Sequence, residues 1–241
     1  MSDNFVLVHG AWHGAWCWAS VIGELEREGH RALAVDLPGH GANPMDPAKV
    51  TLEAYADSVV RFIEDRDLKN VILAGHSLGG LTISAVAERI PKRIKRVIWV
   101  SAMVMLDGEV PAVDLAKSTN QLASFLKPVG EHASMLPAEP FRKFFIQDAS
   151  RDLQDFVISA LVPEPTVTLG ASATRNFRKL GIPTSYIICE DDLCLGDPKL
   201  WHPGFSSRLT NPTMRSIKCS HEVMFTRPVE CARALAELAR G

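Results

Sequence analysis

A serine stands between two glycines in the segment Gly75-His76-Ser77-Leu78-Gly79, directly after the apolar run Val71–Ala74. This spacing matches G-x-S-x-G, a sharp strand-to-helix turn that presents a serine hydroxyl at the edge of a sheet. Glycine suits the flanking positions because the chain approaches itself closely there and larger side chains would clash. The following helix leaves the backbone N–H of Leu78 free to bind a developing oxyanion. The segment therefore predicts Ser77 as the nucleophile of an acyl transfer.

A serine hydroxyl needs a base that takes its proton, and the chain offers eight histidines. His221 follows the last predicted strand and precedes the final helix, which is the place of the base where a triad runs Ser, Asp, His. His76 lies inside the turn, where its side chain cannot reach its neighbour's hydroxyl, so we expect a structural role for it. We therefore predict His221 as the base. The other histidines lie in loops or irregular segments or open a strand: His9, His13, His30, His40, His132 and His202.

The imidazole in turn needs a carboxylate that fixes its tautomer and stabilises the imidazolium. Glu190, Asp191 and Asp192 follow the apolar run Tyr186–Cys189, and the acid is expected a few residues past the end of such a strand. We predict Asp192 as the acid, with Asp191 as the alternative. Asp107, just after the fourth predicted strand, is a minor alternative. Acidic clusters of this kind are otherwise typical of solvated loops.

The second oxyanion donor is expected in the loop after the first strand, His9-Gly10-Ala11, and we assign it to the backbone N–H of Ala11. Trp12, beside this loop, is a candidate for contact with substrate, although packing explains it equally well. Phe125 and Phe145 are candidate pocket residues from the middle of the chain. The alternative for these phenylalanines is a small core of their own. Apolar pockets with few polar groups are typical of small-molecule sites.

These residues must be positioned by strands that alternate with helices, which indicates a parallel sheet covered on both faces. The rhythm lapses from about 105 to 180, where prolines break helical fragments and no convincing strand is found. We predict an α/β core of residues 1–104 and 181–241, with a helical cap inserted at 105–180. The expected strands are Phe5–Val8, Ala32–Val35, Val71–Ala74, Arg96–Val100, Tyr186–Cys189 and Met214–Lys218, and the expected helices are Ala15–Gly29, Thr51–Asp67, Leu78–Ile90, Pro198–Leu209 and Pro228–Arg240.

The composition excludes several classes of protein. The chain has 241 residues, a formal charge of −2 and no basic tract, so neither nucleic acid nor an anionic membrane is indicated as a partner. Its five cysteines show no CxxC spacing, which argues against a disulfide framework and a zinc site. The N-terminal MSDNFVLVHG lacks the charged start of a signal peptide, and no apolar run is long enough for a membrane span. We expect a cytoplasmic protein.

Together the stretches FVLVHGAWHGAWCW, VILAGHSLGG, YIICEDD and SHEVMF resemble the α/β-hydrolase superfamily. The nearest branch is that of the methylesterases and hydroxynitrile lyases, with their bacterial esterase relatives. The resemblance covers roughly Phe5–Ala102 and Pro183–Arg240 and is poor in the cap. It implies a triad of Ser77, Asp192 and His221. It also implies that Ala11 and Leu78 supply the oxyanion hole.

Two positions separate the branches of this family. Hydroxynitrile lyases of this group have threonine where this chain has Gly10, and lysine where it has Glu222. The lysine supplies positive charge for the departing cyanide, whereas Glu222 would place a negative charge there. The resemblance therefore favours an esterase over a lyase.

We expect a serine carboxylic-ester hydrolase for a small-to-medium uncharged ester with an apolar or aromatic portion. The reaction needs no metal or organic cofactor, the expected partner is the ester itself, and a homodimer is left open. The alternatives are a cofactor-independent dioxygenase, a C–C bond hydrolase or a hydroxynitrile lyase at the same site, or a ligand-binding sensor with little turnover. Fold alone does not decide between these chemistries.

Overall fold

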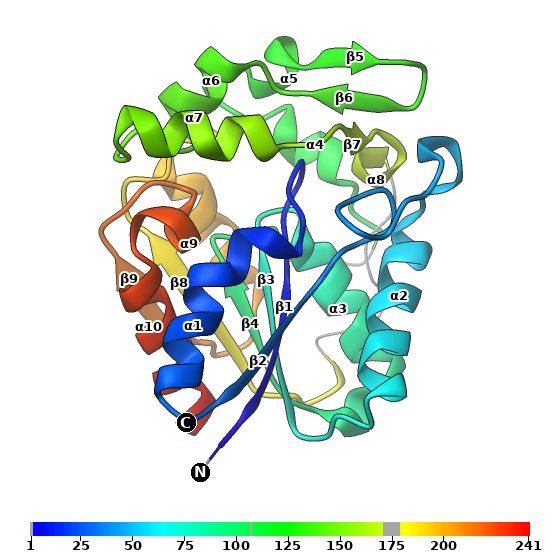
Figure 1. Ribbon diagram of the computed structural model, residues 1–241, viewed down its shortest axis with the longest axis vertical. Coiled ribbons are helices and arrows are strands. Elements are labelled where there is room, and N and C mark those ends of the chain that lie inside the picture. Colours follow the sequence, from blue (N-terminus) through cyan, green and yellow to red (C-terminus); the bar gives the residue numbers. More distant parts are fainter. Residues whose placement is uncertain (1, 107, 171–178) are drawn as a thin grey trace.

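Six parallel strands make up the central sheet of this computed structural model, which describes residues 2–106, 108–170 and 179–241 (Figure 1). In chain order the strands are β1 (Asn4–Val8), β2 (Arg31–Val35), β3 (Val71–His76), β4 (Ile94–Val100), β8 (Thr184–Cys189) and β9 (Thr213–Ile217). Their order across the sheet is β2-β1-β3-β4-β8-β9. All six predicted strands are confirmed within one or two residues.

Helices cover both faces of the sheet. Helices α1 (Ala19–Arg27) and α10 (Pro228–Arg240) pack together on one face, and α2 (Leu52–Asp65) and α3 (Gly79–Arg89) pack together on the other (Figure 1). The predicted fold class, an α/β-hydrolase sheet with helices on both faces, is confirmed. Shorter helical segments of the core are η1 (Ala15–Trp18), η2 (Pro47–Lys49), η3 (Pro91–Arg93), η5 (Pro198–Leu200), η6 (Trp201–Phe205), η7 (Ser206–Arg208) and α9 (Val223–Thr226).

Strand β1 shows why the core strands are apolar throughout. Successive side chains of a strand point to opposite faces of the sheet. Phe5 and Leu7 belong to the core beneath α1 and α10, whereas Val6 and Val8 belong to the core beneath α2 and α3. All of these side chains are fully buried. Because both faces are covered, no position of the strand is left for a polar residue.

Helix α2 shows how local sequence determines where a helix begins and which of its faces is buried. The side chain of Thr51 caps its first turn by accepting a hydrogen bond from the Ala54 N–H at 3.0 Å. Tyr55, Val59 and Ile63 recur every four residues and are buried against the sheet. Capping and periodicity are both local signals, so the predicted helix is confirmed, ending two residues earlier than expected.

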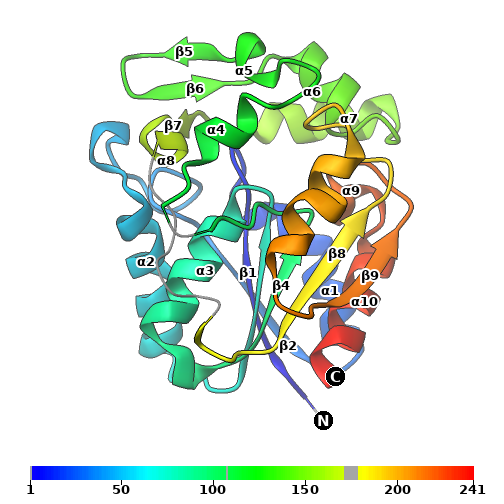
Figure 2. The same ribbon diagram turned by 180° about the vertical axis from the view of Figure 1, so that it is seen from behind.

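The segment from α4 to α8, called the cap here, lies across the carboxyl ends of the strands, at the edge where a nucleophile turn presents its side chain (Figures 1 and 2). The structure does not test the predicted boundaries at 104/105 and 180/181, which stay a prediction. The cap elements are α4 (Pro111–Leu115), α5 (Leu122–Phe125), β5 (Lys127–Val129), β6 (Ala133–Met135), α6 (Ala138–Phe144), α7 (Arg151–Ala160), β7 (Glu164–Pro165) and α8 (Val167–Gly170).

The expectation of a cap without strands is wrong. Strands β5, β6 and β7 pair antiparallel as a small three-stranded sheet. Each has only two or three residues, which is too short for a period-two pattern, and β5 is exposed along its whole length. Pro128 fits β5 because this strand lies at the edge of its sheet.

The single helix expected over Pro198–Leu209 is also wrong. The segment forms three short helical pieces, η5, η6 and η7, and His202 inside η6 has extended dihedral angles, with φ −136° and ψ 122°. His202 precedes Pro203, and the proline ring disfavours helical geometry in the residue before it. Trp201 and Phe205 are both buried, although no continuous helix connects them.

Glycines permit the close approach of chain segments at the turn from β3 to α3. A Cβ on Gly79 would lie 2.5 Å from the carbonyl oxygen of His9 and 3.1 Å from that of Val8. Both atoms are backbone of the neighbouring strand end, so neither can move aside cheaply. A Cβ on Gly75 would lie 2.8 Å from the side chain of Ile83. The expected reason for the glycines that flank Ser77 is therefore confirmed.

Gly79→Ala should lower the free energy of unfolding by about 1–3 kcal/mol, because the added methyl group overpacks a site bounded by backbone. Gly23→Ala in α1 is the matched control, since a Cβ there meets nothing within 4 Å. Alanine should raise stability at Gly23 by roughly 0.5–1 kcal/mol through helix propensity. Urea unfolding monitored by circular dichroism measures both changes. Equal shifts of the two midpoints would contradict the close approach at Gly79.

Candidate active site

Ser77 lies at the turn between β3 and α3 with φ 52°, in the left-handed region that non-glycine residues rarely adopt. Its backbone carbonyl accepts hydrogen bonds from Gly80 and Met103, which hold the turn. The side chain is half-buried and lines a cavity between the core and the cap. A strained dihedral at this point is consistent with a residue whose direction is fixed by its surroundings.

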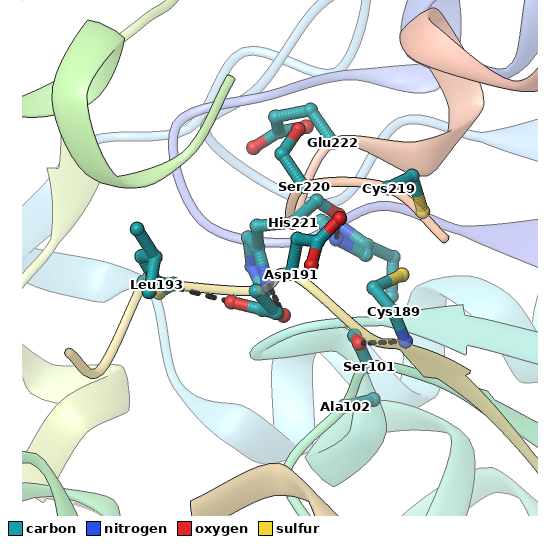
Figure 3. Close-up of polar contacts among 12 residues, drawn as sticks. Ser101, Ala102, Cys189, Asp191, Leu193, Cys219, Ser220, His221 and Glu222 are labelled. Carbon is teal, nitrogen blue, oxygen red and sulfur yellow. Dashed lines mark hydrogen bonds and ion pairs between the residues drawn. The ribbon is translucent and has the colours of Figure 1, made fainter. Parts of the chain in front are cut away.

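Asp192 and His221 form a buried hydrogen-bonded pair, with 2.6 Å between Oδ2 and Nδ1. Their exposed fractions are 0% and 1%. The other oxygen of Asp192 accepts a hydrogen bond from the Cys194 N–H at 2.9 Å, which fixes the carboxylate. Figure 3 shows the turn that carries Asp191 and Leu193 facing the loop of Ser220, His221 and Glu222. The structure thus brings the predicted base and acid together.

The charge state of this pair follows from its surroundings. Burial by itself lowers the pKa of His221, but the adjacent Asp192 carboxylate outweighs burial and raises that pKa well above 6.5. The Nδ1–H of the imidazole donates to Asp192, so Nε2 is the atom available to take a proton. No hydrogen bond reaches this buried Nε2 from the described part of the chain.

The Ser77 hydroxyl and the His221 Nε2 are therefore not hydrogen-bonded in this conformation. Ser77 lines the cavity, and His221 lies directly behind the cavity wall. The imidazole packs against Phe145 and Trp201, with ring centroids 5.3 Å and 5.1 Å away, and both aromatic residues line the cavity that Ser77 lines. Catalytic hydrogen bonds are often long without substrate and shorten when it binds.

His76 holds the backbone of His221 through a hydrogen bond. Its Nε2 donates to the backbone carbonyl of His221 at 3.0 Å, and the two rings lie 4.5 Å apart. Burial lowers the pKa of His76 well below its usual value, an effect strengthened by the neighbouring His221 and His13. A neutral His76 can donate this hydrogen bond without adding positive charge beside the base, which fits the structural role expected for it.

The backbone N–H groups predicted for the oxyanion hole belong to Ala11 and Leu78, which both line the cavity. Within the described residues, neither N–H donates a hydrogen bond. His9 steadies the first of them, because its Nδ1 donates to the Gly10 carbonyl at 2.8 Å, on the same peptide group as the Ala11 N–H. Burial, together with the nearby His40, lowers the pKa of His9 well below its usual value, which keeps it neutral for this role.

The cavity wall is mostly apolar. The predicted contact residues Trp12 and Phe145 line it, and their rings meet edge-to-face at 5.9 Å. Phe125 does not line it: this side chain packs on Phe144, with 6.0 Å between the centroids, and other residues of α5 face the cavity instead. The expectation for Phe125 is therefore wrong. The lining residues are Ala11, Trp12, Ser77, Leu78, Met103, Leu115, Leu122, Ala123, Leu126, Phe145, Glu164, Leu169, Cys194, Leu195 and Trp201.

A model of the alpha/beta hydrolase family matches residues 5–234 of the chain. The chain belongs to the alpha/beta hydrolase family. It is 31% identical over 261 residues to a carbendazim hydrolyzing esterase of Nocardioides sp. (strain SG-4G), covering 98% of this chain and 99% of that protein. It is 30% identical over 252 residues to methylesterase 7 of Arabidopsis thaliana, covering 98% and 96%. These relatives confirm the resemblance to the methylesterase branch.

Solved structures agree. An extracellular alpha/beta-hydrolase from a Paenibacillus species matches with a TM-score of 0.89 and 33% identity, covering 99% of this chain and 100% of that one. That protein is described as sharing structural and functional homology with tobacco salicylic acid binding protein 2. No helix in the described ranges of this hydrolase is long and apolar enough to cross a membrane. The cytoplasmic location and the homodimer stay predictions.

Asp191, the main competing acid of this alpha/beta hydrolase, is not placed as Asp192 is. Asp191 is exposed, and its backbone carbonyl accepts a hydrogen bond from the Gln147 side chain. Asp107 lies outside the described residues. Its neighbour in the sequence, Leu106, is held by the carboxylate of Glu109. Of the two candidate acids in the described ranges, Asp192 is the one that is buried and hydrogen-bonded to His221.

Cys194 is a thiol that the sequence analysis did not identify at this site. Its ligand atom and those of Asp192 and His221 lie within 4.8 Å of one another, close enough to surround a metal ion. Burial raises the pKa of Cys194 to about 11, which leaves a neutral thiol rather than a thiolate ligand. The hydrogen bond between Asp192 and His221 already accounts for the other two groups.

Trp201 and Glu164 also line the cavity of this hydrolase without having been predicted. Trp201 lies where the expected helix breaks, and Glu164 lies in the Pro-rich segment Val162–Pro165 of the cap. Neither segment has a periodic pattern or a motif that would mark a site residue. The Pro-x-Pro spacing around Glu164 was the one available signal, since it indicates an extended segment.

Asp192→Asn should lower kcat roughly 10³- to 10⁴-fold, because an amide neither fixes the imidazole tautomer nor stabilises the imidazolium. His221 must be unprotonated to act as base, so wild-type kcat/KM should rise with pH through a midpoint above 6.5, as expected from its raised pKa. The midpoint should fall in the variant. Hydrolysis rates between about pH 5 and about pH 9 measure both effects.

The matched control is Asp191→Asn, which changes an exposed carboxylate next to the buried one. This variant should keep the wild-type rate and pH profile. A large loss of rate at Asp191 with a normal rate at Asp192 would reverse the assignment of the acid.

Proposed function

We propose that this alpha/beta hydrolase is a serine carboxylic-ester hydrolase that works through Ser77, His221 and Asp192 and an acyl-enzyme. The general class follows from its relatives: the chain is a carboxylesterase-type hydrolase, like proteins named esterase and methylesterase. The observation that best supports the specific mechanism is the buried 2.6 Å hydrogen bond between His221 and Asp192, beside the cavity that Ser77 lines. Such a pair turns an ordinary serine into a nucleophile.

The proposed reaction begins when Nε2 of His221 takes the proton of the Ser77 hydroxyl, whose oxygen attacks the ester carbonyl carbon. The backbone N–H groups of Ala11 and Leu78 bind the oxyanion of the tetrahedral intermediate. The intermediate collapses, and the alcohol leaves with the proton from His221. Water then attacks the acyl-enzyme by the same sequence and releases the acid.

The cavity supports an uncharged substrate with an apolar or aromatic portion. Its wall consists mostly of aliphatic and aromatic side chains, with Trp12, Phe145 and Trp201 as the aromatic members. Among the described residues that line it there is no lysine or arginine, and Glu164 contributes a carboxylate. A negatively charged substrate would lose its hydration here without gaining an ion pair.

Two positions argue against hydroxynitrile lyase chemistry. A Cβ on Gly10 would lie 2.8 Å from the Cβ of Ser77, so this site has no room for the larger residue of those lyases. Glu222 supplies no positive charge beside the base: it is not among the residues that line the cavity, and its carboxylate lies within 4.8 Å of a ring nitrogen of His221. Its buried carboxylate lies 3.3 Å from Nε2 of His13, and it extends away from the Asp191–Leu193 turn (Figure 3).

Ser77→Ala should lower kcat for p-nitrophenyl acetate by several orders of magnitude, roughly 10⁴-fold or more, because the nucleophile is lost. The control is Ser159→Ala, which removes an exposed hydroxyl on α7 and should leave the rate unchanged. Mass spectrometry of the wild type quenched during turnover should show the acyl group on Ser77. A Ser77→Ala variant with wild-type turnover would refute the proposed mechanism.

Neutral esters should be preferred over anionic ones of the same shape. We expect kcat/KM for a methyl ester of an aromatic acid to exceed that of its carboxylate-substituted analogue by roughly tenfold or more, because the buried charge would have no partner. Initial rates for the pair at several salt concentrations measure this. Equal kcat/KM values at low salt would contradict a cavity without a cationic group.

A further inference from the structure

Glu164, on β7 of the cap, is a buried carboxylate with hydrogen-bond partners on both oxygens. It is 1% exposed. Oε2 accepts a hydrogen bond from the Trp12 backbone N–H at 3.1 Å and lies 3.0 Å from Nε2 of His40. Oε1 accepts from the hydroxyls of Tyr55 and Thr168, each at 3.1 Å. A cap residue is thus bound to core elements before β2, after β2 and on α2.

The donors around Glu164 explain why an acid can be buried there. A buried carboxylate without partners would cost several kcal/mol, whereas this one has a donor or an imidazole at each acceptor position. Burial lowers the pKa of His40, but the hydrogen bond and charge of Glu164 outweigh burial and raise that pKa. These contacts occupy both oxygens of the acid, and the Trp12 hydrogen bond is one of them.

Trp12 is the residue directly after Ala11, and the cap holds it at three points. Besides the hydrogen bond to Glu164, its carbonyl accepts from the Val162 N–H at 2.8 Å, and its indole N–H donates to the Ser134 carbonyl at 3.1 Å. Trp12 has φ 65°, a left-handed conformation that is unfavourable for a bulky residue unless its surroundings impose it. These surroundings are cap residues.

The peptide group between Ala11 and Trp12 is held at both ends. Its N–H donates to Glu164, and its carbonyl oxygen accepts from Nδ1 of His13 at 2.7 Å. The preceding peptide group, which carries the Ala11 N–H, is held through the Gly10 carbonyl. Without Glu164, the peptide group between Ala11 and Trp12 would lose the hydrogen bond that its N–H donates. The two peptide groups share the Cα of Ala11, so a displacement of the Ala11–Trp12 peptide group would also shift the group that carries the Ala11 N–H.

We infer that Glu164 is a positioning residue for the oxyanion hole, which it reaches from the cap through the backbone N–H of Trp12. The inference rests on the proposed ester hydrolysis at Ser77. It means that the cap completes the catalytic geometry in addition to shaping the substrate cavity. The hydrogen bond from the Trp12 N–H needs an acceptor oxygen on a side chain as long as that of glutamate. It does not need the negative charge, which interacts with His40.

Three substitutions of Glu164 distinguish the effect of side-chain length from the effect of its negative charge. Glu164→Leu removes the acceptor, and Glu164→Asp keeps the charge but withdraws it from Trp12 by about one methylene. Glu164→Gln loses the charge and keeps an acceptor for the Trp12 N–H, while its amide can donate to the hydroxyls of Tyr55 and Thr168. Glu131→Leu is the control, because its side chain is a cap carboxylate that is 92% exposed.

We expect kcat to fall roughly 10- to 100-fold in the Leu and Asp variants with little change in KM, since part of an oxyanion contact is lost. The Gln variant should recover most of kcat. Affinity for an aryl trifluoromethyl ketone, which forms a tetrahedral adduct, should fall in parallel with kcat. Affinity for the matching unreactive amide should not change. Circular dichroism establishes which variants are folded, and Glu164→Asp decides the matter if Glu164→Leu does not fold.

Folded Leu and Asp variants with wild-type kcat and ketone affinity would overturn the inference. A rise in KM alone would also overturn it, since Glu164 would then act on substrate binding. Ser77→Ala, assayed beside them, keeps the two proposals apart. If Ser77→Ala is inactive and the Glu164 variants are normal, only the positioning role fails; if Ser77→Ala is active, the proposed mechanism fails first.

Discussion

The parallel pairing of β1 with β3 is the constraint on which the site depends. Val8 lies opposite Gly75 in this register, so the loop that leaves β1 meets the turn that leaves β3. The approach is so close that a Cβ on Gly10 would touch Ser77 and a Cβ on Gly79 would touch the His9 carbonyl. Glycine at these positions therefore lets the two backbones converge, and both Ser77 and Ala11 line the cavity.

Buried histidine side chains hold the backbone of the loops that follow the strands. His9, His13 and His76 are at most 2% exposed, and each binds a backbone carbonyl: those of Gly10, Ala11 and His221 respectively. Burying polar rings is unfavourable unless they are hydrogen-bonded, so these contacts are also what makes the rings tolerable. The result is a hydrogen-bonded polar layer beside an apolar cavity, which suits the preorganised oxyanion hole that we propose for Ala11 and Leu78.

The parts of this structure that the sequence predicts are those governed by local rules. The core strands and α2 follow from apolar runs, spacing and a cap, and Ser77 follows from steric rules at one turn. Asp192 and His221 follow from their positions after strands. The cap does not follow, because β5, β6 and β7 are too short to show a pattern and pair only through tertiary contacts. Phe125 and Phe145 both look like pocket residues in the sequence; only the fold of α5 and α6 separates them.

The cap of this hydrolase has two tasks that use different residues. Leu122, Leu126 and Phe145 present apolar surface to the cavity and can vary in size without disturbing any hydrogen bond. Glu164 instead lies in a hydrogen-bonded cluster between cap and core, where a change in length alters several partners at once. Side chains of the apolar wall can therefore change while the cluster keeps its hydrogen bond to the Trp12 backbone. A cap attached in this way holds Trp12, the residue next to Ala11, at three hydrogen bonds, which is why we propose that it belongs to the catalytic frame.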